Sequence, residues 1–488
     1  MKKSNTVVVW LGLARIAQAL IGLAALRLST HYLPVEQFGL LGLLTGITTC
    51  FGLLLVNPLG QHVNRHTHEW HQQHALLYRL RQYNLYLLGL SVTAFGVSAF
   101  WFGSRLVPSP DWLTILAVGI TMSAMVWVGT WNATLVPLLN MLGLPLQSAG
   151  LALFTAVACL LCSVVAVGWQ QTAHMWLTGQ ILGLLAAAAW ALQQLKKLPR
   201  TENRPPSGSA FITHRQIADY CLPIAASTGL MWLLTSGYRF YVDHTWGPHA
   251  LGLLIVGFAV AGQFWAIIET VGTQAIYPKY YLVLSRNDRH LSTQAFNQML
   301  NILIPSYVLM LCFALAISSR LLPLLADSRY ATAAQFCQIA MISEFLRVLT
   351  NVIMQATQIA QKTASMIYPY LFACLVGLAG LIVLQETDGN VLLLPWVLLA
   401  AWGAALLYSL AKVQSLATIS IRWYTLGYAL LAGGTLFIAG QIFRLGGGPL
   451  HDLAFISACG ILTITFLYLI QRNNPEYFEI MKIQLPAE

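Results

Sequence analysis

The chain has 488 residues, of which 57% are apolar and only 9% charged, and its formal net charge at pH 7 is +10. Soluble domains carry about 25% charged residues, so this composition excludes a soluble globular protein. The basic residues are spread over many loops and form no single patch, which argues against a nucleic-acid-binding surface.

Apolar segments long enough to cross a bilayer recur from one end of the chain to the other. A spanning helix needs about 20 mostly apolar residues. We predict fourteen spans, at 6–28, 38–58, 83–104, 112–138, 147–168, 175–193, 217–236, 250–272, 295–318, 332–353, 365–384, 391–410, 424–442 and 453–471. Close spacing of the third, fourth and last pairs leaves totals of twelve or thirteen open. The predicted fold class is an all-α polytopic membrane protein.

Lysine and arginine alternate between the two sets of loops. Eighteen lie on the side that holds both termini and six on the other, with Arg15 and Arg347 left inside spans. Because cytoplasmic loops carry the excess of basic residues, we predict that both termini are cytoplasmic. The N-terminal Met1-Lys2-Lys3 and the following apolar run resemble a signal peptide. Arg15 interrupts that run and many spans follow, so we interpret it as a retained first helix.

Arg15 lies about nine residues into the first predicted span. This is about 14 Å deep in a hydrocarbon core about 30 Å thick. An ionised side chain at that depth costs at least roughly 2.5–3.5 kcal/mol, so it faces a wet cavity, a partner or a ligand. Gln18 continues the same helical face. Two interpretations stay open: Arg15 binds an anionic headgroup, or it forms a structural ion pair with Glu344 or Glu269.

The second span is followed by a polar face that contains Asn57, Gln61 and Arg65. A guanidinium suits bidentate phosphate binding, so Arg65 is a candidate first contact for a phosphate at the cytoplasmic mouth. The alternative is a plain positive-inside anchor. Further along, 68–71 is one residue short of the zinc-protease pattern, and we favour a solvated amphipathic helix over a metal site there.

Residues 194–216 are basic and rich in Pro, Gly and Ser, which predicts a flexible cytoplasmic linker. We predict a six-helix bundle on each side of this linker, at 1–193 and 217–422. Two additional spans and a cytoplasmic tail occupy 423–488.

A weak internal repeat supports this division. The segments 33–41 and 247–254 each place Gly-Leu-Leu just after a short polar turn and an apolar residue, at an offset of about 213 residues. Since the offset covers six spans, the two bundles are predicted to be parallel repeats.

The seventh and eighth spans contribute three charged candidates. Arg239 and Asp243 are four residues apart near the predicted outer mouth. They form either a gate pair or an interfacial salt bridge of little energetic value. Glu269 lies near the cytoplasmic end of the eighth span and is a candidate site for proton or sodium coupling. Glu344 competes with it for that role.

The tenth span carries a polar stripe spaced 3, 4, 4, 3 and 4 residues apart, at Glu344, Arg347, Asn351, Gln355, Gln358 and Lys362. This spacing predicts one stripe of an α-helix, which must meet protein or water rather than lipid. A buried network that joins helices is one interpretation. We favour the wall of a cavity, because helix packing rarely needs five polar turns in a row.

Motifs of the common enzyme classes are absent from the sequence. There is no P-loop, G-x-G-x-x-G or G-x-S-x-G, and no predicted outward loop exceeds about 15 residues. A membrane polysaccharide polymerase or glycosyltransferase usually places its catalytic residues in a long outward loop. We therefore predict that the chain is not an enzyme.

Several short motifs resemble those of bacterial O-antigen and exopolysaccharide flippases. They are the segment 33–40, the segment 60–65 with Glu69, Asp243 before a Gly-Leu-Leu helix start, and 330–334 at the start of the tenth span. These flippases belong to the multidrug/oligosaccharidyl-lipid/polysaccharide (MOP) exporter superfamily.

The resemblance implies two six-helix bundles around a central cavity, with two extra C-terminal helices and alternating access. It implies a multi-pass protein of the bacterial inner membrane that flips a polyprenyl-pyrophosphate-linked oligosaccharide outward, coupled to H⁺ or Na⁺ and without other cofactors. Expected partners are membrane lipids and other polysaccharide assembly proteins, and we expect a monomer. Candidate substrate-binding residues are Arg15, Gln18, Arg27, Arg65, Arg239, Arg347, Asn351 and Gln355, and candidate ion-coupling residues are Glu269, Glu344 and Asp243.

Two other members of the same superfamily are the nearest alternatives. A multidrug exporter would bind organic cations in an acidic, aromatic cavity, whereas the charges inside the spans are at least as basic as acidic. A lipid II flippase differs from the favoured function only in its substrate.

Overall fold

Long apolar runs fold as helices because a chain in lipid must satisfy its backbone hydrogen bonds internally. The computed structural model describes residues 2–72, 75–104, 111–142, 144–197, 214–284, 288–359, 363–387, 389–443, 448–472 and 474. Every regular element within these residues is a helix. The predicted all-α fold class is therefore confirmed.

Thirteen helical stretches of the described chain are long and apolar enough to cross a membrane. One of them, Cys221–Gly272, has 52 residues and is long enough to cross twice. Its backbone bends at Gly247, where φ is 82°. Counted as two, this stretch raises the total to the predicted fourteen, and the chain is a multi-pass membrane protein.

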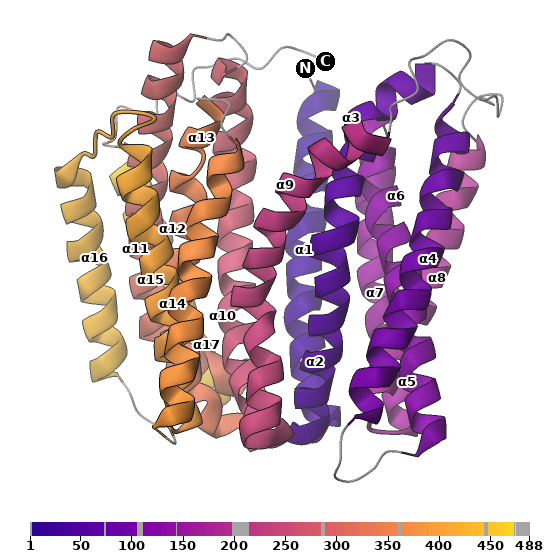
Figure 1. Cartoon of the computed structure of the whole chain (residues 1–488). Coiled ribbons are helices and arrows are strands. Elements are labelled where there is room, and N and C mark those ends of the chain that lie inside the picture. The colour runs from indigo at the N-terminus through magenta and orange to yellow at the C-terminus, as the bar shows by residue number, and fades with distance from the viewer. Residues whose placement is uncertain are drawn as a thin grey trace. The chain divides into compact units, whose positions relative to one another are not determined.

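Contacts divide the chain into two compact units, Met1–Gly252 and Leu253–Glu488. The N-terminal unit (Figure 1) contains α1 (Lys2–Tyr32), α2 (Val35–Phe51), η1 (Gly52–Val56), α3 (Asn57–Gln72), α4 (Leu76–Gly103), α5 (Trp112–Ala124), η2 (Met125–Gly129), α6 (Thr130–Met141), α7 (Pro145–Trp169), α8 (Ala173–Lys197), α9 (His214–Trp232), η3 (Leu233–Gly237) and the first turns of α10 (Tyr238–Leu284).

The C-terminal unit contains the rest of α10, α11 (Arg289–Leu325), η4 (Ser328–Ala333), α12 (Ala334–Ile353), α13 (Ala356–Ile359), η5 (Thr363–Met366), α14 (Ile367–Glu386), η6 (Val391–Leu393), α15 (Leu394–Val413), α16 (Trp423–Ile442) and α17 (Pro449–Arg472). Most of the predicted linker, residues 198–213, lies outside the described residues. The two compact units divide after Gly252, which is C-terminal to this linker. The bundle boundaries at 1–193 and 217–422 stay a prediction.

The seventh span groups with the N-terminal unit because its side chains bond to the backbone of α2 and η1. Thr228 Oγ1 donates to Leu53 O at 2.6 Å, Trp232 Nε1 to Gly46 O at 2.9 Å, and Arg239 Nη1 to Gly42 O at 2.9 Å. Leu53 belongs to η1, a π-helical segment, whereas Gly42 and Gly46 belong to α2. These three bonds join the seventh span to α2 and η1.

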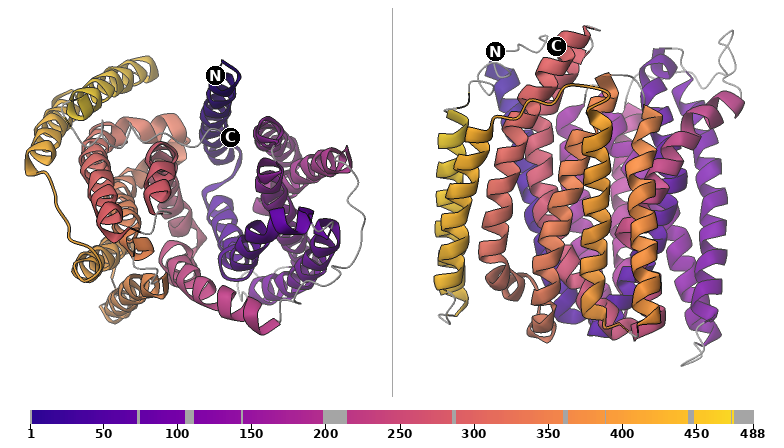
Figure 2. Two further views of the ribbon diagram at one scale, coloured as in Figure 1. Left: turned by 90° about the horizontal axis from the view of Figure 1, so that it is seen from above. Right: turned by 60° about the vertical axis from the view of Figure 1, so that its left-hand side comes forward.

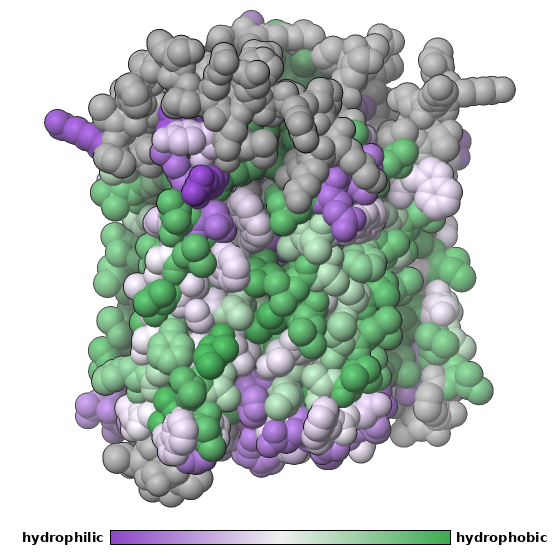
Figure 3. All heavy atoms as spheres, turned by 90° about the vertical axis from the view of Figure 1, so that its right-hand side faces the viewer, coloured by the Kyte–Doolittle hydropathy of each residue, from purple (hydrophilic) through white to green (hydrophobic). Residues whose placement is uncertain are grey.

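The apolar surface expected of a membrane protein is visible on the N-terminal unit. In Figure 3, apolar side chains fill the middle of the visible face, and hydrophilic side chains gather at its lower margin. Large apolar side chains of this unit are widely exposed, including Phe100 at 78% and Val92 at 69%. Such exposure is unfavourable in water and is what a lipid-facing surface requires.

The two copies of the predicted repeat pack against each other. A Cβ placed at Gly39 would overlap the carbonyl oxygen of Pro248, and a Cβ at Gly252 would overlap that of Val35. The contacts are reciprocal, since Gly39 and Gly252, like Val35 and Pro248, are 213 positions apart. The helix starts therefore meet about a local pseudo-two-fold axis, and only glycine allows this approach.

Replacing either glycine with alanine is expected to lower stability by about 1–3 kcal/mol, because an added methyl group must push two backbones apart. Thermal unfolding of Gly39→Ala and Gly252→Ala in detergent measures this. Gly89→Ala is the matched control, since nothing lies within 4 Å of a Cβ placed there. Equal melting temperatures for all three variants would contradict the reciprocal contact.

The last two helices are fixed to α11. Gly433 of α16 packs against Cys312, and Gly440, seven residues later, packs against Ala316, so small side chains let the helices approach closely. On α17, Asp452 accepts from Arg320 Nε at 3.2 Å, and the Arg320 guanidinium lies 3.7 Å from the Phe455 ring centroid. Figure 2 shows α16 and α17 at the margin of the C-terminal unit.

Candidate functional site

The C-terminal unit holds a cluster of charged side chains inside the membrane-spanning region. Glu269 comes from α10, and Glu344 and Arg347 come from α12. Arg347 Nε donates to Glu344 Oε2 at 2.6 Å, and Arg347 Nη2 donates to Glu269 Oε2 at 3.1 Å. The i,i+3 spacing on α12 brings Glu344 to the guanidinium, and packing of α10 on α12 brings Glu269.

Neutral side chains complete the bonding of this cluster. Asn351 lies one turn beyond Arg347, and its Nδ2 donates to Glu269 Oε1 at 3.2 Å. The hydroxyl of Tyr370, from α14, donates to Asn351 Oδ1 at 3.0 Å. Both oxygens of Glu269 are thus bonded, and α10, α12 and α14 are joined through one polar network. Such a network specifies one arrangement of its helices.

The charges of the cluster do not balance. Two carboxylates share one guanidinium, and the exposed fractions are 15% for Arg347, 16% for Glu344 and 25% for Glu269. With all three groups ionised the cluster carries one excess negative charge. One carboxylate of the cluster is therefore left without a basic partner among these three groups.

An aromatic wall adjoins the cluster. Trp265 is fully buried on α10, one turn before Glu269, and its Nε1 donates to Met341 O at 2.9 Å. Tyr307 of α11 is also buried and packs edge-on against the Trp265 ring, with centroids 6.0 Å apart. Its hydroxyl has no hydrogen-bond partner. That oxygen faces Gly272, which follows Glu269 by one turn, so an unbonded hydroxyl lies beside the acidic cluster.

The predicted stripe on the tenth span is interrupted in the structure. We expected the stripe to follow one helical face through Lys362, but α12 ends at Ile353, where the tenth predicted span also ends, and a single turn, α13, follows at Ala356–Ile359. Gln355 lies in the break, where its backbone carbonyl accepts from Tyr280 and its Oε1 from Tyr281 at 2.9 Å. The expectation that the whole stripe lies on one helix is therefore wrong, and in the break the Tyr280 hydroxyl of α10 bonds to the backbone carbonyl of Gln355. Lys362 lies outside the described residues.

The remaining predicted site residues belong to the N-terminal unit. Arg239 bonds to α2 through Gly42 O and also through Thr45 Oγ1 at 3.4 Å, so it joins two helices. Asp243, Gln18 and Arg27 are half-buried. Arg65 lies on α3, and its side chain lies outside the described residues.

Arg15 is exposed on α1, between apolar neighbours that are also exposed, Leu13 at 51% and Ile16 at 60%. Its Nη1 donates to Gln18 Oε1 at 3.1 Å, one turn away. No described carboxylate of its own unit forms an ion pair with it. The structure therefore places a guanidinium with a neutral partner on a surface that is otherwise apolar.

Three polar features of the structure were not identified from the sequence: the Tyr370 hydroxyl, the Tyr307 hydroxyl and the contact between Glu36 and His249. Tyr370 and Tyr307 are single aromatic residues in apolar spans, which the sequence does not distinguish from packing residues. His249 Nδ1 lies 2.7 Å from Glu36 Oε1. Both residues lie within the copies of the repeat, at equivalent positions 213 residues apart, so the repeat itself was the signal for this pair.

No family model matches the sequence, and no curated protein matches it. Solved structures do match. Lipid II flippase MurJ in its inward closed conformation is 11% identical, with a TM-score of 0.68 over 95% of this chain and 99% of its own. An outward-facing multidrug resistance MATE family transporter of the MOP superfamily is 11% identical, with a TM-score of 0.52 over 84% and 96%. The eukaryotic MATE transporter AtDTX14 is 11% identical, with a TM-score of 0.54 over 90% and 99%.

These likenesses establish the fold. The chain has the helical fold seen in transporters of the MOP superfamily, and at 11% identity the comparison shows nothing finer. A shared fold does not by itself imply a shared substrate.

Proposed function

We propose that the chain is a flippase that moves polyprenyl-pyrophosphate-linked oligosaccharide from the cytoplasmic to the outer leaflet by alternating access. It acts in the bacterial inner membrane as a monomer with both termini in the cytoplasm. It hands its product to other proteins of polysaccharide assembly. The shared fold supports transport in general, and the motifs at 33–40 and 60–65 support the polysaccharide branch.

The observation that carries the proposal is the exposed guanidinium of Arg15. A cation on an apolar surface at membrane depth needs water or an anion beside it. Gln18 is neutral and leaves the charge unbalanced. A pyrophosphate has the concentrated negative charge that such a group binds, and it cannot cross lipid unaided. Arg27 and Arg239 offer further contacts at other depths, which keeps any one site from holding the substrate too tightly.

The cluster around Arg347 supports coupling to an ion gradient. Its excess negative charge and the unbonded Tyr307 hydroxyl fit a small cation or a proton. Uptake of one positive charge would neutralise the spare carboxylate and change the strength of the bonds that join α10, α12 and α14. The cluster therefore couples an ion to the packing of these helices.

Replacing Glu269 or Glu344 with glutamine is expected to remove the gradient dependence of transport. Each substitution leaves one carboxylate for one guanidinium, so the cluster no longer needs an added cation. Transport by reconstituted vesicles, with and without an imposed proton or sodium gradient, measures this. Glu386→Gln, an exposed carboxylate at the end of α14, is the matched control. Gradient dependence in both single variants and in the double variant would place coupling elsewhere.

A multidrug exporter is the second candidate, and the composition of the cluster favours it. Two carboxylates lie beside Trp265, Tyr307 and Tyr370, and an organic cation suits acidic and aromatic surroundings. A lipid II flippase is the third candidate, since this chain matches the structure of lipid II flippase MurJ with a TM-score of 0.68.

Reconstitution separates these candidates. Vesicles that contain the protein and a synthetic polyprenyl-pyrophosphate-linked oligosaccharide report its arrival in the opposite leaflet through a glycosidase that cannot cross the membrane. We expect the lipid-linked oligosaccharide to reach the opposite leaflet only when both the protein and an ion gradient are present. Movement of a fluorescent organic cation without movement of the glycolipid would assign the chain to multidrug export. Movement of lipid II alone would assign it to the third candidate.

A further inference from the structure

A cavity of about 470 Å³ lies in the C-terminal unit, separate from the charged cluster. Its walls come from α11, α12, η6, α15 and α16. Gln335, Gln338 and Ile342 lie on one face of α12. Phe437 and Gln441 are one turn apart at the end of α16. The volume falls within the range of small-molecule sites, about 300–1,000 Å³.

The three glutamine amides in this cavity are free to bind a ligand. Gln338 and Gln441 are half-buried and Gln335 is exposed. None of the three amides has a hydrogen-bond partner among the described residues. An amide group both donates and accepts, and at the edge of a membrane an unbonded amide gains from any ligand that does the same. Three such groups in one cavity fit a ligand with several hydroxyls.

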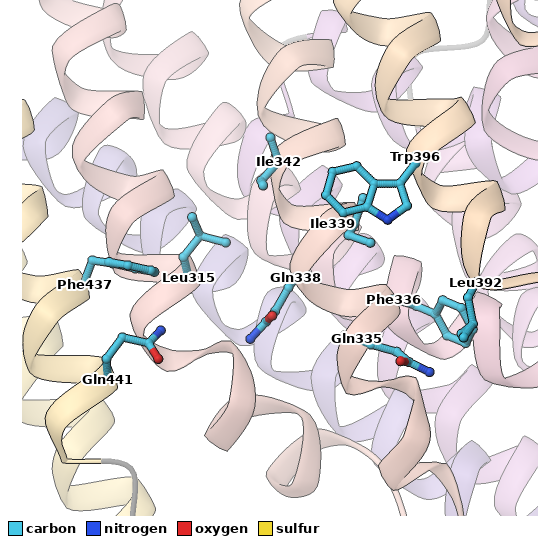
Figure 4. A pocket seen from close by; sticks show the side chains of 10 residues that line it. All are labelled: Leu315, Gln335, Phe336, Gln338, Ile339, Ile342, Leu392, Trp396, Phe437 and Gln441. Carbon is cyan, nitrogen blue, oxygen red and sulfur yellow. The ribbon is translucent and has the colours of Figure 1, made fainter.

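The rest of the lining selects an uncharged, amphiphilic ligand. None of the lining residues is ionisable, so the cavity offers no counter-charge to a phosphate or an amine. The Trp396 ring is 55% exposed and presents an aromatic face of the kind on which the C–H surface of a sugar ring packs. Figure 4 shows the three amides in the lower half of the cavity, with Leu315, Ile342 and Trp396 above them. Phe336 and Leu392 lie beside Gln335, so the amides are set among apolar side chains, as an amphiphilic ligand requires.

We propose that this cavity binds the neutral sugar head of an amphiphile. The glutamine amides bond to its hydroxyls, the Trp396 ring packs against the sugar ring, and the hydrocarbon chain follows Leu315 and Ile342. This proposal does not depend on the flippase function, because a glycolipid could bind the cavity in any membrane that contains one. The sugar head belongs either to a glycolipid of the membrane or to a polyprenyl-linked glycan.

A chain-matched pair of amphiphiles tests the proposal. The full-length protein is placed in nanodiscs that contain no glycoside, and a diazirine-bearing dodecyl glucoside is photo-cross-linked to it. We expect cross-links to peptides that contain 335–342, 392–396 or 437–441. Unlabelled dodecyl maltoside should compete at least tenfold better than dodecyldimethylamine oxide, which has the same chain and no sugar. Cross-links elsewhere, or equal competition by the two amphiphiles, would overturn the site.

Substitutions identify the side chains that bind the sugar. Gln338→Leu and Gln441→Leu are each expected to weaken dodecyl glucoside binding about tenfold, the loss of about one hydrogen bond to an uncharged group. Trp396→Ala should weaken it similarly and Trp396→Phe should restore most of it. Gln170→Leu, an exposed glutamine of the N-terminal unit, is the matched control. Unchanged binding in all the cavity variants would refute the assignment.

The source of the sugar head is decided by a competition with two ligands. A polyprenyl-pyrophosphate-linked oligosaccharide that displaces the photoprobe at lower concentration than a diacyl glycolipid assigns the site to the polyprenyl-linked glycan. The reverse order assigns it to a membrane glycolipid. If neither displaces the probe, the sugar-head proposal fails. Because the assay measures binding alone, its result is independent of any failure of the flippase proposal.

Discussion

Replacing Arg15 with alanine is expected to abolish transport while leaving the fold intact. The side chain is exposed and, among the described residues of its unit, bonds only to Gln18, so its loss leaves no described buried partner unsatisfied. The loss removes the cation that we assign to the pyrophosphate. Complementation of a strain that lacks the protein, with expression and melting temperature measured in parallel, checks both halves of this prediction.

Two further variants sharpen the Arg15 experiment. Arg15→Lys keeps the charge but loses the planar guanidinium, which can form two parallel hydrogen bonds to a phosphate, so we expect weak residual transport. Arg81→Ala removes an exposed arginine from α4 and should transport normally. Normal complementation by Arg15→Ala would show that Arg15 is structural and that the substrate site lies elsewhere.

Replacing Arg347 with methionine is expected to have the largest effect on stability. Arg347 is 15% exposed and bonds to both carboxylates, so its loss leaves two like charges close together and poorly solvated. Removing one partner of a buried ion pair typically costs roughly 3–5 kcal/mol. Thermal unfolding in detergent, followed by size-exclusion chromatography, should show a large drop in the melting temperature and loss of transport.

A triple variant separates stability from coupling. With Glu269→Gln and Glu344→Gln added to Arg347→Met, no charge remains in the cluster, and most of the lost stability should return. Gradient-dependent transport should not return, because no group is left to take the ion. Stability that stays low in the triple variant would mean that Arg347 acts through packing, and recovery of coupling would contradict the role of the carboxylates.

The parts of the fold that lipid dictates could be predicted from the sequence. Each span follows from the need for about 20 apolar residues, and the tight entry at Gly247 follows from its place in the repeat. Glu344, Arg347 and Asn351 could be placed on one face because the α-helical period is local. The tenth predicted span, 332–353, also ends where α12 ends, at Ile353. The break that separates Gln355 from this helix could not be predicted from the polar stripe, because Tyr280 of α10 bonds to the Gln355 carbonyl from a distant part of the sequence.

The sequence does not determine which side chains on different helices form ion pairs or hydrogen bonds. Glu269 was a candidate partner for Arg15, whereas the structure pairs it with Arg347. That pairing depends on the register between α10 and α12, which the local pattern does not encode. Tyr370 reaches Asn351 from α14 for the same reason. The contact between Glu36 and His249 is the exception, because the repeat relates the two positions.

The measurement that tests flipping most directly is the sidedness of lipid-linked oligosaccharide in cells that lack this protein. Spheroplasts are treated with a glycan-reactive probe that cannot cross the membrane, and the labelled fraction is compared with that of cells carrying the intact chain. We expect complete units to stay unlabelled on the cytoplasmic face of cells without the protein, with labelling restored by the intact chain but not by Arg15→Ala. Normal labelling without the protein would contradict it.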